Sequence, residues 1–231
     1  MPKFYIEEAS INFRAFFNRM LSSLPVPGTS AFATLCKRLH PYGMSPSGIE
    51  LEAPTAKLSD VTMIISLLQE RLMLRMTYGW FEVFVRDVGE DELSSILTVI
   101  QVSRDVSLEV DNEVTIEKCT VGVTSHLILP SYNSQDYINE YLHLNPDSQG
   151  LVPEAFSYNV SLKSSANIQD ARVVVAKSAK YEGALFIDVT LEYKDLSNGI
   201  PTEHQAGEDY RSTLALLSLE PTDAPEGDFA Q

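Results

Sequence analysis

The sequence predicts an α+β protein with a mostly antiparallel sheet, and three observations support this class. Apolar and polar residues alternate with a period of two over many short stretches, as in strands buried on one face. A few other stretches carry apolar residues at spacings of three and four, as amphipathic helices do. The connections between neighbouring stretches are short, which favours antiparallel pairing. We therefore expect an antiparallel sheet with helices packed on one face.

The alternation predicts the strands one by one. In segment 185–193, Asp188 and Thr190 fall on the polar side of an otherwise apolar pattern. Equally clear alternation predicts strands at 9–17, 71–78 and 156–163. Further strands are predicted at 48–52, 61–68, 80–87, 114–129 and 172–178. The longest of these, 114–129, is predicted to bend or bulge near Gly122.

Helical patterns are fewer than strand patterns. Segment 91–103 has apolar residues at helical spacing after an acidic start, which complements the helix dipole. Segment 29–39 begins at a possible cap, Thr29 or Ser30, and ends before Pro41. A short helix is predicted at 134–142 and a last, weak helix at 209–219.

The order of these elements predicts two loosely similar β-α-β units. Residues 1–110 read as strand, helix, four strands and helix, and residues 111–200 as strand, helix and three strands. We expect the two units to pack as one globular body, with a β-sandwich-like arrangement as the alternative. Residues 201–231 are predicted to form a weak helix and an acidic, flexible tail.

The net charge and the apolar content of the sequence limit the kinds of molecule to which the protein is expected to bind. The 231 residues carry a net charge of −15, from 32 acidic and 17 basic side chains. Because nucleic-acid phosphates attract the opposite sign, direct DNA or RNA binding is disfavoured. No apolar run reaches the roughly 18 residues that a membrane span needs. The first ten residues include two glutamates where a signal peptide would be apolar, so we expect a soluble, cytoplasmic protein without a membrane partner.

Motifs for metal, cofactor or catalytic chemistry are missing from the sequence. The two cysteines, Cys36 and Cys119, do not form a CxxC pair, and the histidines have no metal-ligand spacing: His40, His126, His143 and His204. There is also no glycine-rich phosphate loop and no Gly-x-Ser-x-Gly nucleophile motif. We therefore predict no cofactor, no metal and no catalytic residue.

One segment is typical of a contact surface. It combines methionine, aromatic and arginine side chains, which are enriched in protein–protein interfaces. The candidate interface residues are Arg71, Met73, Arg75, Tyr78, Trp80 and Phe84. A central pair of core strands explains the same pattern, because both faces of the segment are partly apolar.

Three residues are candidates for a pocket. Asp188 interrupts an apolar strand, and the pattern places His126 and Tyr158 within other predicted strands. Clustering of these three side chains around one cavity would favour an enzyme or a ligand carrier. Their dispersal would end that hypothesis.

Several short segments resemble a sporadically distributed, uncharacterised bacterial family of similar length. Residues 6–14 resemble the opening apolar strand of that family, and residues 78–81 resemble its Tyr-x-x-Trp-like element. Residues 127–130 match a strand that ends in Ile-x-Pro, and residues 136–139 match a short helix that contains Asp-Tyr. Residues 185–189 resemble the closing strand. The segment 123–126 departs from the Arg-Tyr-rich positions usual in that family. The resemblance implies an α+β fold and no particular activity.

Together these observations favour a non-enzymatic binding or assembly protein, either an accessory subunit or a self-associating module. Long strands with open edges invite such pairing with a protein partner. One alternative is an acidic inhibitor that mimics the charge of DNA. The other is a small-ligand carrier or enzyme that uses a pocket between sheet and helices.

Overall fold

A computed structural model describes residues 2–55, 57–89, 92–142, 153–160, 168–194, 196 and 199–222. Within these ranges the chain forms four α-helices and a ten-stranded sheet. The predicted α+β class with an antiparallel sheet is therefore confirmed. None of the helices in these ranges has both the length and the apolar character to cross a membrane.

The elements follow one another in a regular order. The first seven are β1 (Lys3–Phe17), α1 (Ser30–Leu39), β2 (Ile49–Glu52), β3 (Thr62–Leu67), β4 (Leu72–Met76), β5 (Trp80–Val85) and α2 (Leu93–Val110). The next seven are β6 (Ile116–Ile128), α3 (Ser134–Tyr141), β7 (Ala155–Val160), β8 (Ile168–Lys177), β9 (Leu185–Tyr193), α4 (Glu203–Ala215) and β10 (Glu220–Pro221). Three short 3₁₀ turns lie between α1 and β3.

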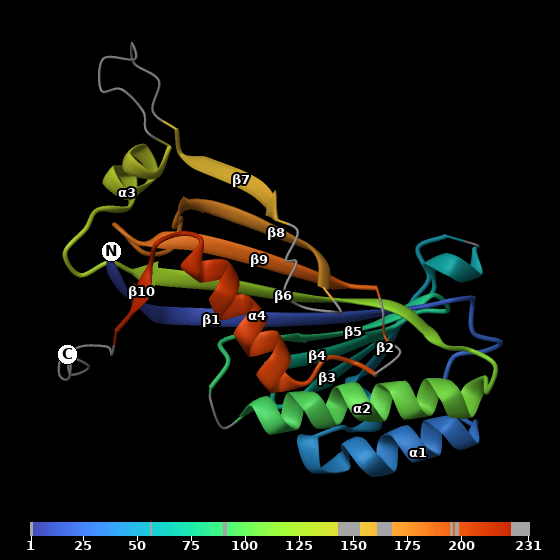
Figure 1. The fold of residues 1–231 in the computed structure, drawn as a ribbon. Coiled ribbons are helices and arrows are strands. Elements are labelled where there is room, and N and C mark those ends of the chain that lie inside the picture. The colour runs from blue at the N-terminus through green and yellow to red at the C-terminus, as the bar shows by residue number, and fades with distance from the viewer. Residues whose placement is uncertain are drawn as a thin grey trace.

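The sheet is centred on the two longest strands, β1 and β6 (Figure 1). The strand order is β2-β3-β4-β5-β1-β6-β9-β8-β7, and every pair along it is antiparallel. The short strand β10 runs parallel to the start of β1, where Lys3 is paired with Glu220. The ends of the described chain therefore lie close together.

The predicted bulge near Gly122 is wrong. Gly122 pairs in register with Asn12 on β1 and with Thr190 on β9. The irregularities in the β1–β6 ladder lie near its two ends, between Ile6 and Glu8 and between Phe16 and Phe17. The long strand thus stays regular through its glycine, because both of its neighbours continue the ladder there.

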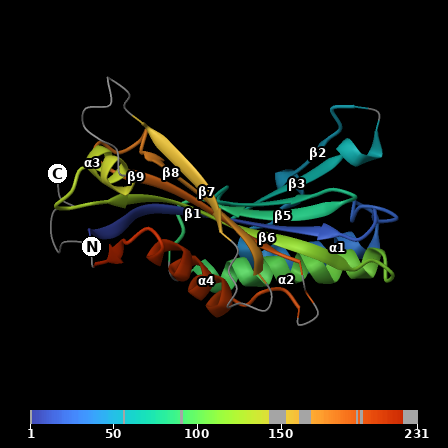
Figure 2. The ribbon, with the colours of Figure 1, turned by 45° about the horizontal axis from the view of Figure 1, so that its top comes forward.

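Helices α1, α2 and α4 lie against the same face of the sheet, which we call the helix face (Figure 2). Its side chains come from alternate residues, such as Phe13 on β1 and Val121 on β6, and both are buried. Tyr141 of α3 stacks on Phe156 of this face, with ring centroids 4.8 Å apart. In the described part of the chain no helix covers the opposite face, which we call the open face.

In the first half of the chain, apolar side chains attach the helices to the sheet. Leu35 and Leu39 of α1 are fully buried where α1 packs against α2. Helix α2 contributes buried aliphatic side chains along its length: Ile96, Val99, Ile100, Val102 and Val106. Thr29 caps α1, as predicted, by accepting a hydrogen bond from the Phe32 amide.

In the second half, tyrosine hydroxyls attach the helices. The Tyr193 hydroxyl on β9 donates to Asp209 of α4 at 3.1 Å. The Tyr210 hydroxyl of α4 lies 2.9 Å from the Ser125 hydroxyl on β6. Tyr137 of α3 donates to a backbone carbonyl after α4 at 2.6 Å. Burial raises the pKa of all three tyrosines, so their hydroxyls stay neutral.

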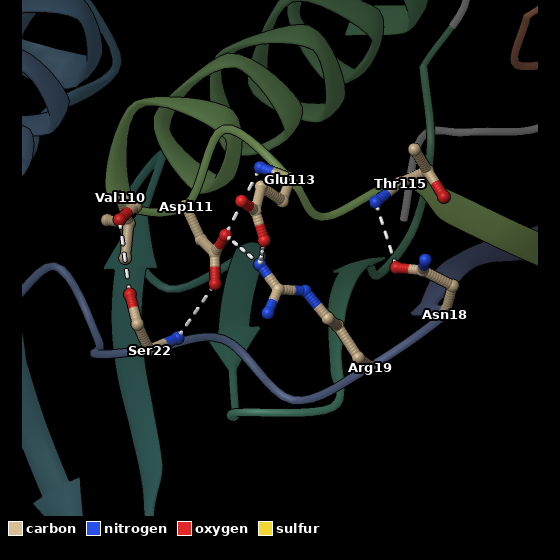
Figure 3. A network of polar contacts seen from close by, with 7 residues as sticks. All are labelled: Asn18, Arg19, Ser22, Val110, Asp111, Glu113 and Thr115. Atoms are coloured by element: carbon tan, nitrogen blue, oxygen red, sulfur yellow. Dashed lines mark hydrogen bonds and ion pairs between the residues drawn. The ribbon is translucent and has the colours of Figure 1, made fainter.

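A polar network joins the loop after β1 to the connection between α2 and β6 (Figure 3). Arg19 donates to Asp111 at 2.6 Å and to Glu113 at 3.0 Å. Asp111 follows the last residue of α2, and its side chain is only 6% exposed. The Asn18 side chain accepts a hydrogen bond from the Thr115 amide at 2.9 Å. These contacts fix where β6 begins beside the end of β1.

The C-terminal region differs from its prediction. Helix α4 starts at Glu203, earlier than the predicted 209–219, and Thr202 caps it. The predicted helix is therefore present but begins earlier, and residues 220–221, which were predicted as tail, form strand β10. Four predicted features lie outside the described residues: the end of the tail at 223–231, the end of the strand predicted at 156–163, His143, and the acidic start of the predicted helix 91–103 at residues 90 and 91.

Candidate ligand pocket

An apolar pocket of about 620 Å³ lies between the helix face and helices α2 and α4. Its floor is the central strand pair, β1 and β6, and its walls are the facing sides of the two helices. The lining residues are Ile11, Phe13, Leu93, Ile96, Leu97, Ile100, Val121, Val123, Ile200, Pro201, Thr202, His204, Ala206, Gly207, Tyr210 and Arg211.

Small residues on α4 leave this space open. Ala206 and Gly207 face the pocket where α4 passes over the central strands. A Cβ atom built on Gly207 would meet one heavy atom within 4 Å, the Nη2 atom of Arg211, at 3.9 Å. As a result Ile11 and Val123, directly below, remain only partly buried.

The polar groups of the pocket lie on its α4 side. His204 is 78% exposed at the rim and lies 3.4 Å from Glu208, one turn further along α4. The Nε atom of Arg211 donates to the Gly207 carbonyl at 3.3 Å. The Tyr210 hydroxyl lies beside Ser125 of β6, which is outside the lining. Because the remaining wall is aliphatic and aromatic, the cavity is suited to an apolar molecule with at most a few polar groups.

Four of the predicted interface residues lie together on the open face of β4 and β5: Met73, Arg75, Trp80 and Phe84. Arg71 precedes β4, and its guanidinium pairs with Glu92. Tyr78 lies in the turn between β4 and β5 and packs against the core instead. The alternate residues of β4 are fully buried on the helix face: Leu72, Leu74 and Met76. The segment therefore contributes to the core on one side and to an uncovered surface on the other.

Sequence reasoning missed the residue that organises this surface, Glu82. Its side chain is only 2% exposed, and its Oε1 atom accepts hydrogen bonds from Asn12 at 2.9 Å and from the Nε atom of Arg14 at 3.1 Å. Arg75 reaches the other carboxylate oxygen at 3.3 Å. Burial alone would raise the pKa of Glu82, but the hydrogen bonds from Arg14 and Asn12 and the nearby positive charges lower it. The available signal was a lone acid in an apolar strand that also carries Trp80.

The three predicted pocket residues do not line one cavity. Tyr158 pairs with Val173 on the helix face, whereas Asp188 and His126 lie on the open face. His126 is held at the strand end, where its Nδ1 atom lies 2.9 Å from the Ser178 hydroxyl. Asp188 lines a separate, polar pocket on the open face. The three side chains are therefore dispersed, because alternate residues of paired strands project to opposite faces. This ends the ligand-carrier hypothesis in the form that rested on them, and none of the three lines the apolar pocket.

No protein-family model and no curated protein matches the chain. Among solved structures, it is similar to a rolling circle replication initiator protein from Geobacillus stearothermophilus, with 8% sequence identity and a TM-score of 0.29. That alignment covers 83% of this chain and 75% of the initiator. A similarity of this degree establishes neither a shared fold nor a shared function, and the resemblance to the bacterial family stays a prediction.

Proposed function

We propose that the protein is a non-enzymatic binding protein that holds a small apolar molecule between its sheet and helices α2 and α4. The observation that carries this proposal is the pocket of about 620 Å³ over the central strands. Small-molecule sites typically have volumes of about 300–1,000 Å³ and mostly apolar walls with a few polar groups. The walls of this pocket match that description.

Binding of 1-anilinonaphthalene-8-sulfonate to the full chain tests the proposal, because this fluorescent probe has a large apolar body and a single charged group. We expect saturable binding by the wild type and a loss of at least about tenfold in affinity for Gly207→Leu, whose side chain fills the cavity. Ala215→Leu is the matched control, because it adds similar bulk on an exposed position of the same helix. Equal binding by the wild type and Gly207→Leu would contradict the proposal.

A second candidate function is self-association through strand β7. This edge strand reads Ala-Phe-Ser-Tyr-Asn-Val without a charge, whereas the opposite edge, β2, carries Glu50 and Glu52. Charged residues protect sheet edges from pairing with other chains, so β7 is the less protected edge. Among the described residues β7 pairs with β8 alone.

Light scattering coupled to size-exclusion chromatography tests this candidate. We expect the wild type to form a dimer and Ser157→Lys, on the exposed side of β7, to be a monomer. Glu50→Lys changes the charge of the opposite edge and serves as the control, which should remain dimeric. A wild type that stays monomeric at high concentration would exclude β7 pairing.

We also propose that the chain consists of two related units, from β1 to α2 and from β6 to α4. Both units have the order strand, helix, meander and helix. In the sheet, β1 and β6 pair at the centre, and each is flanked by the last meander strand of its own unit. A circular permutant that joins the chain ends and opens at Asn112, between the units, should therefore lose only the stability that the contacts of Asp111 and Glu113 contribute. A permutant opened at Gly183, within the second meander, should lose stability.

A further inference from the structure

A second pocket, of about 310 Å³, lies on the open face over the centre of the sheet. It is separated from the apolar pocket by the sheet itself. Its lining comes from four strands, β1, β5, β6 and β9, and is largely polar: Ser10, Asn12, Arg14, Phe84, Thr120, Gly122, Thr124, Asp188 and Thr190. None of these residues belongs to the apolar pocket.

Many polar groups in this pocket have no partner within the described part of the protein. Four hydroxyl side chains line it without a side-chain hydrogen bond to a described residue: Ser10, Thr120, Thr124 and Thr190. The Asp188 carboxylate makes no ion pair or hydrogen bond there either, and burial raises its pKa despite the positive charge of Arg172. The Oδ1 atom of Asn12 is buried and unpaired. Such groups are expected to be satisfied by water or by a ligand.

The remaining polar groups are held in place by Glu82. The Nδ2 atom of Asn12 donates to Glu82, which leaves the Oδ1 atom of the same amide as the free end. The Arg14 guanidinium binds Glu82 through Nε and Nη2 and lies over the Trp80 ring, 4.7 Å from its centroid. The pocket thus presents fixed acceptors and freely rotating hydroxyls, which can both donate and accept.

The charged side chains in and beside the pocket determine whether a cationic, an anionic or a neutral ligand fits. An ammonium group at Asp188 would also meet the positive charges of Arg14 in the lining and of Arg172 on the neighbouring strand. A carboxylate or phosphate would meet Asp188. A neutral polyol avoids both conflicts, and its hydroxyls can donate to Asp188 and Asn12 while accepting from the threonines.

We propose that the open-face pocket binds a neutral, polyhydroxylated small molecule of the size of a mono- or disaccharide. Gly122 lies at the centre of the lining, between Asn12 and Thr190, and leaves the floor free of a side chain. Phe84 supplies an apolar wall against which the C–H face of a sugar ring can pack. The site lies outside the proposed apolar-ligand function and does not depend on it.

The test is saturation-transfer NMR and calorimetry on the full chain with glucose, galactose, mannose, maltose, cellobiose and lactose. We expect the wild type to bind at least one of these sugars with a dissociation constant of about 1 mM or tighter. Asp188→Asn should weaken that binding about tenfold, because it removes the charged acceptor. Gly122→Ala should weaken it similarly, because a Cβ atom fills the floor while meeting Asn12 at an ordinary 3.6 Å.

Asp170→Asn is the matched control, since Asp170 is a carboxylate on the open face of β8, outside the pocket. It should bind sugar as the wild type does. Thermal melts and far-ultraviolet circular dichroism report whether each variant is folded. The proposal is overturned if no sugar binds, if Asp188→Asn and Gly122→Ala bind as the wild type does, or if spermidine binds while every sugar fails.

Discussion

The two halves of the molecule cover the same face of one sheet by different means. In the first half, α1 and α2 pack through aliphatic side chains, and the strand residues beneath them, such as Leu74 and Val83, are fully buried. In the second half, α4 is a mostly polar helix that is tied down by Tyr193 and Tyr210. Aliphatic packing closes the space beneath a helix, whereas hydroxyl pairs position a helix and leave room beside it. The apolar pocket lies between α2, which packs through aliphatic side chains, and α4, which is held by hydroxyl groups.

The largest expected effects come from cavities in the shared core. Leu74 on β4 and Leu191 on β9 are both fully buried, so Leu74→Ala and Leu191→Ala should each lower the free energy of unfolding by about 3–4 kcal/mol. Urea unfolding followed by the fluorescence of the single tryptophan, Trp80, measures both. Because the halves share a sheet, we expect Leu191→Ala to shift the Trp80 transition as well. An unchanged Trp80 transition would show that the halves unfold independently.

Lowering the pH should change the stability contributions of Glu82, in the first half, and Asp209, in the second half, in opposite directions. The folded-state pKa of Glu82 is lowered, so its ionisation stabilises the fold above the ordinary glutamate pKa, and this stability is lost as pH falls through the folded value. Burial raises the pKa of Asp209, although the Tyr193 hydrogen bond opposes it. The contribution of Asp209 is therefore lost as pH rises through its folded-state pKa.

Urea unfolding of Glu82→Gln and Asp209→Asn across the acidic range measures these contributions. Glu82→Gln should cost about 2 kcal/mol at neutral pH, where charge-assisted hydrogen bonds are lost. The difference from the wild type should shrink in acid. Asp209→Asn should lose no stability at neutral pH, and a loss there as large as that of Glu82→Gln would contradict the contrast.

Removing single hydroxyls should loosen α4 more than it destabilises the whole fold. Tyr193→Phe and Tyr210→Phe should each cost about 1 kcal/mol, the net value of one hydrogen bond. We expect hydrogen exchange to accelerate in residues 203–215 and to stay unchanged in α2. Tyr5→Phe is the control, because the Tyr5 hydroxyl has no hydrogen bond to a described residue. Equal acceleration in α2 would mean that the hydroxyls do not act locally.

The smallest expected effect is an increase in stability. Gly207 lies inside α4 with space around its Cβ position, so Gly207→Ala should raise the free energy of unfolding by about 0.5–1 kcal/mol. Thermal or urea unfolding measures this gain. A loss instead would show that the room left by this glycine has a structural role.

Much of the fold could be predicted from local alternation, because a half-buried strand needs apolar side chains on one side only. Strand β9 was predicted with its observed bounds, whereas the start of β1 was missed because the irregularity between Ile6 and Glu8 interrupts its alternation. Helix α4 was placed too late, since its first turns hold few apolar residues. The strand β10 has only two residues and leaves no pattern.

The sites were harder to predict, because they depend on which strands become neighbours. Alternation already placed Tyr158 on an apolar side and Asp188 on a polar side, so their separation could have been recognised. In contrast, the meeting of Asn12, Gly122 and Thr190 on one rung requires the order of β1, β6 and β9 in the sheet. The apolar pocket depends on the spacing of α2 and α4, which no local pattern records.

The central pairing of β1 with β6 also sets an order of events during synthesis. Asn12 and Gly122 are partners, yet β6 leaves the ribosome only after the whole first half has been made. The meander from β2 to β5 and its pairing with β1 can form earlier, because these contacts are closer along the chain. Until β6 arrives, the long inner edge of β1 is exposed to other nascent chains. We therefore expect the newly made first half to be the stage at which this protein most needs a chaperone.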